Sequence, residues 1–153
     1  ATMVLFPLTI IAGALSDKMG RRPVVISGLL MGTILIVPAY QFLQTLSQQI
    51  TPDYFLMGVT LIAIALPLAL VVGPQTALLA ELFPARTRNS AATLPHNLAA
   101  GWIGGMLPLI VTWLNKEFSS PLAGLWYPTI FLAIAAGLAI FFLPETRKID
   151  LRK

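Results

Sequence analysis

Two short charged clusters interrupt the long apolar runs of this chain. They are the stretches GALSDKMGRR (13–22) and ELFPARTRNS (81–90). Carboxylates and basic groups this close together form ion pairs, and pairs that break and form again could latch one conformation of a protein. The side chains that could take part are Asp17, Lys18, Arg21, Arg22, Glu81, Arg86 and Arg88.

Three polar side chains lie inside apolar runs: Gln75, His96 and Asn97. An amide in apolar surroundings must find hydrogen-bond partners or face water. One interpretation is that Gln75 and Asn97 line a polar cavity and contact a solute, with His96 as a proton carrier. The other is that Asn97 bonds to a neighbouring helix and His96 lies neutral in the interface.

No pattern of residues points to catalysis or to a bound cofactor. The single His has no second ligand at a useful spacing, so no metal site is predicted. The chain contains no Cys, which excludes disulfides and thiolate chemistry. Because a nucleophile–base pair and a phosphate loop are also missing, we predict a protein that is not an enzyme and uses no cofactor.

The composition is that of an integral membrane protein. Of the 153 residues, 57% are hydrophobic and 10% charged, and the mean hydropathy is +0.83. A soluble domain is normally about 25% charged. The isoelectric point near 9.9 could suggest nucleic-acid binding. However, the basic residues separate apolar segments, so we predict a lipid bilayer and no nucleic acid as their partner.

Five apolar runs are expected to form a transmembrane bundle. They cover about 1–15, 24–43, 54–79, 91–114 and 122–143, and 144–153 form a polar tail. A span needs about 20 residues, so the first run is interpreted as three-quarters of a helix in a piece of a longer polypeptide. Close helix packing is expected at small residues four apart. These pairs are Gly28 and Gly32, Gly101 and Gly105, and Ala133 and Gly137.

Basic residues alternate between the connections of these runs. Lys and Arg number three, zero, two, one and four in successive connections and the tail. Because cytoplasmic loops are rich in Lys and Arg, both charged clusters and the C-terminus are predicted to face the cytoplasm of a cell (inner or plasma) membrane. The clusters could latch a conformation or merely set this topology, and the sequence leaves both roles open.

The first cluster resembles a loop motif of the major facilitator superfamily. The matching residues are Gly13, Asp17, Lys18, Gly20, Arg21 and Arg22. The order Glu81-x-Phe83-Pro84-x-Arg86-x-Arg88 and then Leu143-Pro144-Glu145-Thr146-Arg147 is similar to later elements of that superfamily. The resemblance covers essentially the whole chain and implies helices eight (partial) to twelve, most of the C-terminal six-helix half.

The resemblance also implies a mechanism. It implies alternating access between two six-helix halves, with the missing N-terminal half as a partner whose helix Asp17 would cap. It implies a cytoplasmic charge network that includes Glu145 and Arg147 beside the residues of both clusters. No predicted span contains an acidic residue. Carboxylates for proton coupling are therefore expected in the missing half or the missing seventh helix.

Within the superfamily, the chain is most similar to metabolite:proton symporters. The resemblance rests on Gly73-Pro74-Gln75, on Asn97-Leu98 and on Gly104-Gly105. We therefore expect part of a secondary transporter that moves a small organic acid or zwitterion together with protons. The alternatives are a sugar porter or facilitator of the same superfamily, and a truncated fragment that does not transport.

Overall fold

A computed structural model describes residues 2–49, 53–82, 93–94, 96–120 and 122–144. Every regular element in these ranges is a helix, which confirms the predicted all-α class. The elements are α1 (Thr2–Met19), α2 (Arg21–Ser47), α3 (Tyr54–Leu82), the π-helix η1 (Ala99–Gly104), α5 (Gly105–Glu117), the 3-10 turn η2 (Ala123–Leu125) and α6 (Trp126–Phe142).

Four helical stretches within the described ranges are long and apolar enough to cross a membrane. They are Arg21–Ser47, Tyr54–Leu79, His96–Glu117 and Ala123–Phe142. Residues 2–15 of the first apolar run lie in α1, which continues past the run as far as Met19. The limits of each span against the bilayer remain predictions.

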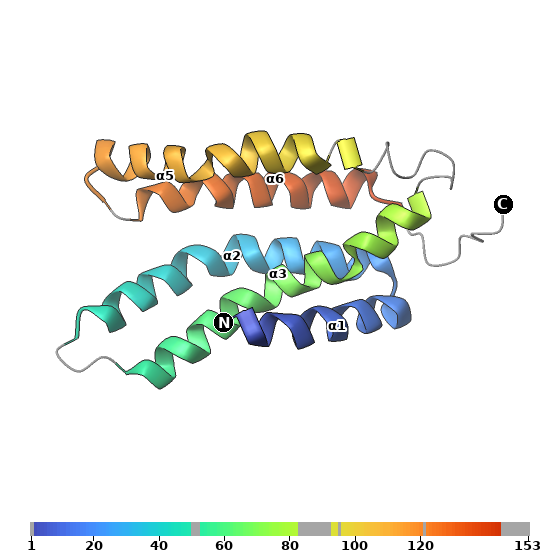
Figure 1. The fold of residues 1–153 in the computed structure, drawn as a ribbon, viewed down its shortest axis with the longest axis horizontal. Helices are drawn as coiled ribbons and strands as arrows, with labels where there is room; N and C mark the ends of the chain where they lie inside the picture. Colours follow the sequence, from blue (N-terminus) through green and yellow to red (C-terminus); the bar gives the residue numbers. More distant parts are fainter. Residues whose placement is uncertain (1, 50–52, 83–92, 95, 121, 145–153) are drawn as a thin grey trace.

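The helices form two layers (Figure 1). The first contains α1, α2 and α3, with α3 packed against both of the others. The second is the hairpin of α5 and α6, joined through η2, and it lies on the first layer through contacts of α6 with α2. The residues at the α1–α2 connection and at the end of α3 therefore meet at one end of the bundle.

Between the first two apolar runs, about 1–15 and 24–43, the sequence predicts a polar turn over residues 16–22, which the structure corrects. Residues up to Met19 are helical, and α2 begins at Arg21, so only Gly20 separates the two helices. The Gly20 N–H donates to the carbonyl oxygen of Ser16 at 2.9 Å and completes the last turn of α1. Gly20 has φ 111° and ψ 153°, a backbone region that is essentially restricted to glycine.

Close contacts between helices are made by glycines. A Cβ added to Gly73 of α3 would lie 2.6 Å from the carbonyl oxygen of Thr9 and 2.9 Å from the nitrogen of Gly13, both backbone atoms of α1. Gly28 of α2 meets α3 similarly, because its added Cβ would lie 3.0 Å from the carbonyl oxygen of Pro67. Small residues allow this approach, which drives helix association in lipid.

The other two small-residue pairs do not serve this purpose among the described residues. An added Cβ at Gly101 or Gly137 would meet nothing within 4 Å. At Gly105 it would meet only the carbonyl oxygen of Ala100, in the preceding turn, at 4.0 Å. At Gly101, Gly105 and Gly137, the described part of the chain therefore shows no close helix contact of the kind expected.

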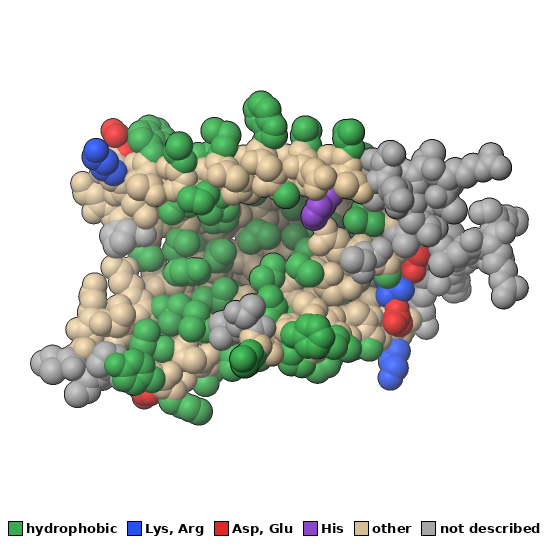
Figure 2. Space-filling view, in the orientation of Figure 1, with side chains coloured by type: hydrophobic (Ala, Val, Ile, Leu, Met, Phe, Trp, Pro, Cys, Tyr) green, Lys and Arg blue, Asp and Glu red, His purple; other side chains and the backbone are tan. Residues whose placement is uncertain are grey.

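The surface of the bundle suits a bilayer. Large hydrophobic side chains are exposed along its length, among them Phe6, Ile34, Trp102 and Phe141. Figure 2 shows hydrophobic side chains over the middle of one face of the bundle, whereas charged side chains lie towards its two ends. Buried hydrophobic residues are mostly small, such as Ala12, Ala69 and Ala136.

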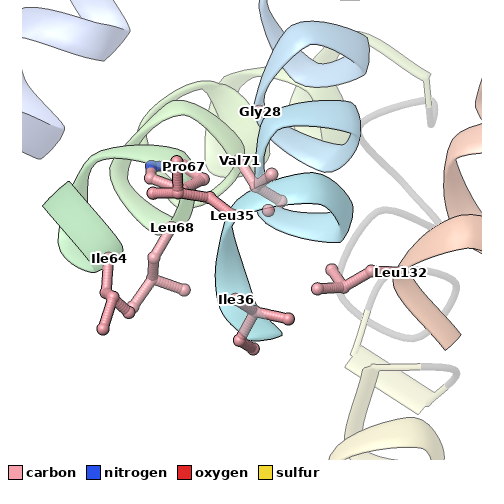
Figure 3. Close-up of a pocket in the computed structure, with 9 residues that line it drawn as sticks. Gly28, Leu35, Ile36, Ile64, Pro67, Leu68, Val71 and Leu132 are labelled. Atoms are coloured by element: carbon pink, nitrogen blue, oxygen red, sulfur yellow. The ribbon is translucent and has the colours of Figure 1, made fainter. Parts of the chain in front are cut away.

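An apolar cavity of about 230 Å³ lies between α2, α3 and α6. Gly28 and Gly32 form its α2 wall beside Leu35 and Ile36, and Leu132 of α6 points towards them (Figure 3). The side chains around this cavity include no polar group. The cavity therefore offers van der Waals contact but no specific polar recognition.

Candidate gating and solute-binding sites

Arg21 is the centre of a charge cluster that joins α1, α2 and α3. Its Nε and Nη2 donate to Oε1 of Glu81 at 3.2 and 3.0 Å, and Nε also lies 3.4 Å from Oε2. Its Nη1 pairs with the Asp17 carboxylate. The Arg21 and Glu81 side chains are each only 12% exposed, whereas Asp17 is 62% exposed. Because its planar fork meets Glu81 through two nitrogens, this pair is stronger than an ordinary surface contact.

Ser16 connects the guanidinium of Arg21 to the backbone of α1. Nη1 of Arg21 also donates to Oγ of Ser16 at 2.7 Å, and this hydroxyl donates to the carbonyl oxygen of Gly13 at 2.8 Å. Ser16 is completely buried. The one-residue break at Gly20 brings the first residue of α2 back over the last turns of α1, which is the geometry this contact needs.

Arg22 has different surroundings from its neighbour. Its Nη2 donates to the carbonyl oxygen of Ile140 at 2.5 Å and so ties α2 to the end of α6. Lys18 is exposed at the end of α1. Arg86, Arg88, Glu145 and Arg147 lie outside the described residues, so their place in the expected charge network remains a prediction.

A second polar contact joins α3 to the segment before η1. Nε2 of Gln75 lies 3.4 Å from Nδ1 of His96, a long hydrogen bond that forms when the ring proton is on Nε2. Gln75 follows Pro74, which is fully buried and cannot donate to the carbonyl four residues before it. The amide and the imidazole thus form a polar contact between otherwise apolar helices.

Asn97 is exposed and lies next to this contact in sequence. The structure therefore brings Gln75 together with His96 and not with Asn97. Two residues further on, η1 begins, and the Gly105 N–H that follows it donates to the carbonyl oxygen of Ala100, five residues earlier. Such π-helical turns are frequent at functional sites because they shift the side chains that follow.

Sequence reasoning missed two residues that shape these sites. Ser16 lies in the first charged cluster, but only the charged side chains of that cluster are singled out in the sequence. Gly73 enters the sequence analysis only through the resemblance of Gly73-Pro74-Gln75 to symporters, although it allows the close approach of α1 and α3. A small residue directly before a proline in a long apolar run was the signal available for Gly73.

Comparison with known proteins gives a consistent picture. The family model described as "Sugar (and other) transporter" matches residues 1–153. The chain is 31% identical over 137 residues to the ectoine/proline transporter ProP of Corynebacterium glutamicum, covering 88% of this chain and 25% of that protein. It is 31% identical over 140 residues to the citrate-proton symporter of Salmonella typhi, covering 90% of this chain and 31% of the relative.

A third relative is the inner membrane metabolite transport protein YhjE of Escherichia coli. It is 30% identical over 142 residues, which cover 90% of this chain and 29% of the relative. The chain thus spans between a quarter and a third of the length of these relatives. No solved structure gave a significant match.

Proposed function

Because this chain belongs to the sugar (and other) transporter family of the major facilitator superfamily, we propose that it forms part of a transporter for small organic acids or zwitterions. The transporter moves its solute by alternating access and takes protons in the same direction. The observation that carries the proposal is the similarity to a citrate-proton symporter and an ectoine/proline transporter over nearly the whole chain. In this proposal the remaining helices belong to the same polypeptide.

The charge cluster supports a gating role in this transporter. Arg21 holds three helices together at one end of the bundle through Glu81, Asp17 and Ser16. A change of conformation that separates α3 from α1 and α2 must break the contact with Glu81. The largely buried Arg21–Glu81 pair would therefore stabilise one conformation, and the exposed Asp17 would be available to a helix outside this chain.

Uptake by the complete polypeptide tests the proposed function. Labelled citrate, proline, betaine and glucose would be offered to proteoliposomes with and without an inward proton gradient. Accumulation of a carboxylate or zwitterion that rises with the gradient is expected. Uptake of glucose alone, independent of the gradient, would favour a sugar facilitator. No uptake of any solute by correctly folded protein would favour the fragment that does not transport.

The Gln75–His96 contact yields a prediction about solute binding. We expect Gln75→Ala or His96→Ala to raise the half-saturation concentration for the solute about two- to tenfold. Each variant would remove one hydrogen bond to the solute, and such a bond is worth about 0.5–1.5 kcal/mol. The measurement is initial uptake rate against solute concentration. Asn97→Ala, measured in parallel, tests the third candidate for the polar cavity that the sequence predicts.

A matched control for these variants is Thr112→Val. Thr112 also lies in a predicted span, but its hydroxyl donates to the carbonyl oxygen of Pro108 in its own helix at 2.7 Å. The half-saturation concentration of the Thr112→Val variant for the solute should equal that of the unchanged protein. If all of the Gln75, His96 and Asn97 variants match this control, the three side chains serve packing alone.

The membrane topology can be tested because the chain contains no Cys. Single cysteines at Lys18, Asp53 and Lys116 place a thiol at three exposed positions. In cells carrying an otherwise cysteine-free version of the complete polypeptide, a membrane-impermeant maleimide should label positions 53 and 116 but not 18. Labelling should reach position 18 only after permeabilisation. The opposite pattern would reverse the proposed orientation.

A further inference from the structure

We propose that a groove on α2, beginning at Arg22, binds an anionic phospholipid. The groove is shallow and open to the surroundings, and it is lined by Arg22, Pro23, Ile26, Ser27 and Leu30, almost entirely through apolar atoms. Its apolar residues extend along α2 from the charged end of the bundle. The nine residues from Arg22 to Leu30 extend about 12 Å along the helix axis, which leaves room for part of an acyl chain.

The hydrogen bonding of Arg22 supplies the site for a phosphate. A guanidinium has five N–H donors, and one of those on Arg22 is used by the carbonyl oxygen of Ile140. Within the described residues, no carboxylate lies within ion-pair distance of Arg22. The neighbouring Arg21, in contrast, is held by two carboxylates and a hydroxyl. Arg22 therefore keeps donors for a planar, bidentate contact with a phosphate.

The apolar side chains that line the groove favour a lipid over a free phosphate as its ligand. Pro23 and Leu30 are exposed on the groove, and Leu30 keeps 42% of its surface accessible. A headgroup on Arg22 would place its acyl chain along these side chains. The cavity between α2, α3 and α6 lacks this combination, because its lining residues include no charged group (Figure 3).

Native mass spectrometry of the detergent-solubilised complete polypeptide, titrated with phosphatidylglycerol, tests this inference. Arg22→Gln should weaken binding of the first lipid about tenfold, as expected for the loss of a charge-assisted bidentate contact. Lys18→Gln is the matched control, since it removes one positive charge at the same end of the bundle outside the groove. The affinity of the Lys18→Gln variant for phosphatidylglycerol should change less than about twofold.

Two further arms distinguish the lipid from other ligands. Ser27→Trp, which fills the groove but leaves Arg22 in place, should also weaken phosphatidylglycerol binding. Phosphatidylcholine, inorganic phosphate and glycerophosphoglycerol should bind more weakly than phosphatidylglycerol to the unchanged protein. Equal losses in Arg22→Gln and Lys18→Gln, or equal binding of glycerophosphoglycerol, would overturn the inference. These outcomes do not depend on which solute the transporter carries.

Discussion

Replacing Gly73 with alanine is expected to destabilise the bundle, although alanine normally stabilises a helix relative to glycine. The new Cβ would lie 2.6 Å from the carbonyl oxygen of Thr9 and 3.0 Å from Cβ of Ala12. The first of these atoms belongs to the α1 backbone, so no side chain can rotate away and α1 itself must move. Overpacking of this kind costs about 1–3 kcal/mol. We expect a lower midpoint of thermal unfolding, measured by the fluorescence of the detergent-solubilised complete polypeptide.

Gly58→Ala is the matched control for this prediction. Gly58 lies in the same helix, and an added Cβ there would meet nothing within 4 Å. The substitution should be neutral or stabilise the protein by up to about 1 kcal/mol. Gly73→Ala should thus lower the unfolding midpoint, whereas Gly58→Ala should leave it unchanged or raise it. A shift of the same sign and size in both would show that α1 and α3 do not pack as closely as described.

The second large effect is expected at the Arg21–Glu81 pair. Glu81→Gln removes the more buried of the two carboxylate partners of Arg21, whose side chain is 12% exposed. Losing one member of a buried pair costs about 3–5 kcal/mol and losing one of an exposed pair less than about 1 kcal/mol, so an intermediate loss of about 2 kcal/mol is expected. The unfolding midpoint of the complete polypeptide should fall accordingly. If the pair is a latch, the turnover rate of transport should change as well.

Two further variants test whether the loss of stability comes from the Arg21–Glu81 pair itself or from the change in net charge. The double variant Arg21→Glu with Glu81→Arg should recover part of the stability that either single change loses. Asp17→Asn should cost much less stability, because the Asp17 side chain is 62% exposed. It should nevertheless slow transport if Asp17 contacts a helix outside this chain. Equal stability of Glu81→Gln and the unchanged protein would mean that the pair only sets topology.

The helical membrane class could be predicted because it depends on composition. Long runs that water cannot solvate must be satisfied by helical hydrogen bonds inside a bilayer. The gathering of Asp17, Arg21 and Glu81 at one end could be expected for a similar reason, since charge is costly in the middle of a span. Both expectations follow from one-dimensional patterns and need no knowledge of how the helices are rotated.

The individual contacts could not be predicted, because they depend on that rotation. Adjacent residues on a helix point about 100° apart. Whether Glu81 meets Arg21 or Arg22 is therefore decided by the angle at which α2 leaves Gly20. The same argument applies to Gln75, which meets His96 and not its neighbour Asn97. Positions far apart in sequence, such as Gly73 and Thr9, approach each other only after the helices have packed.

Only Gly20 separates α1 from α2, so the facing ends of these two helices are held close together. Consecutive Cα atoms are about 3.8 Å apart, so the facing ends of the two helices cannot separate by more than a few ångströms. The link from α2 to α3 is longer, with residues 48–53 between the two helices. Any displacement of the start of α2 must therefore be passed on to α1, whereas α3 can move with more independence. Gly20 in this way keeps the end of α1 beside the start of α2 in every conformation of the bundle.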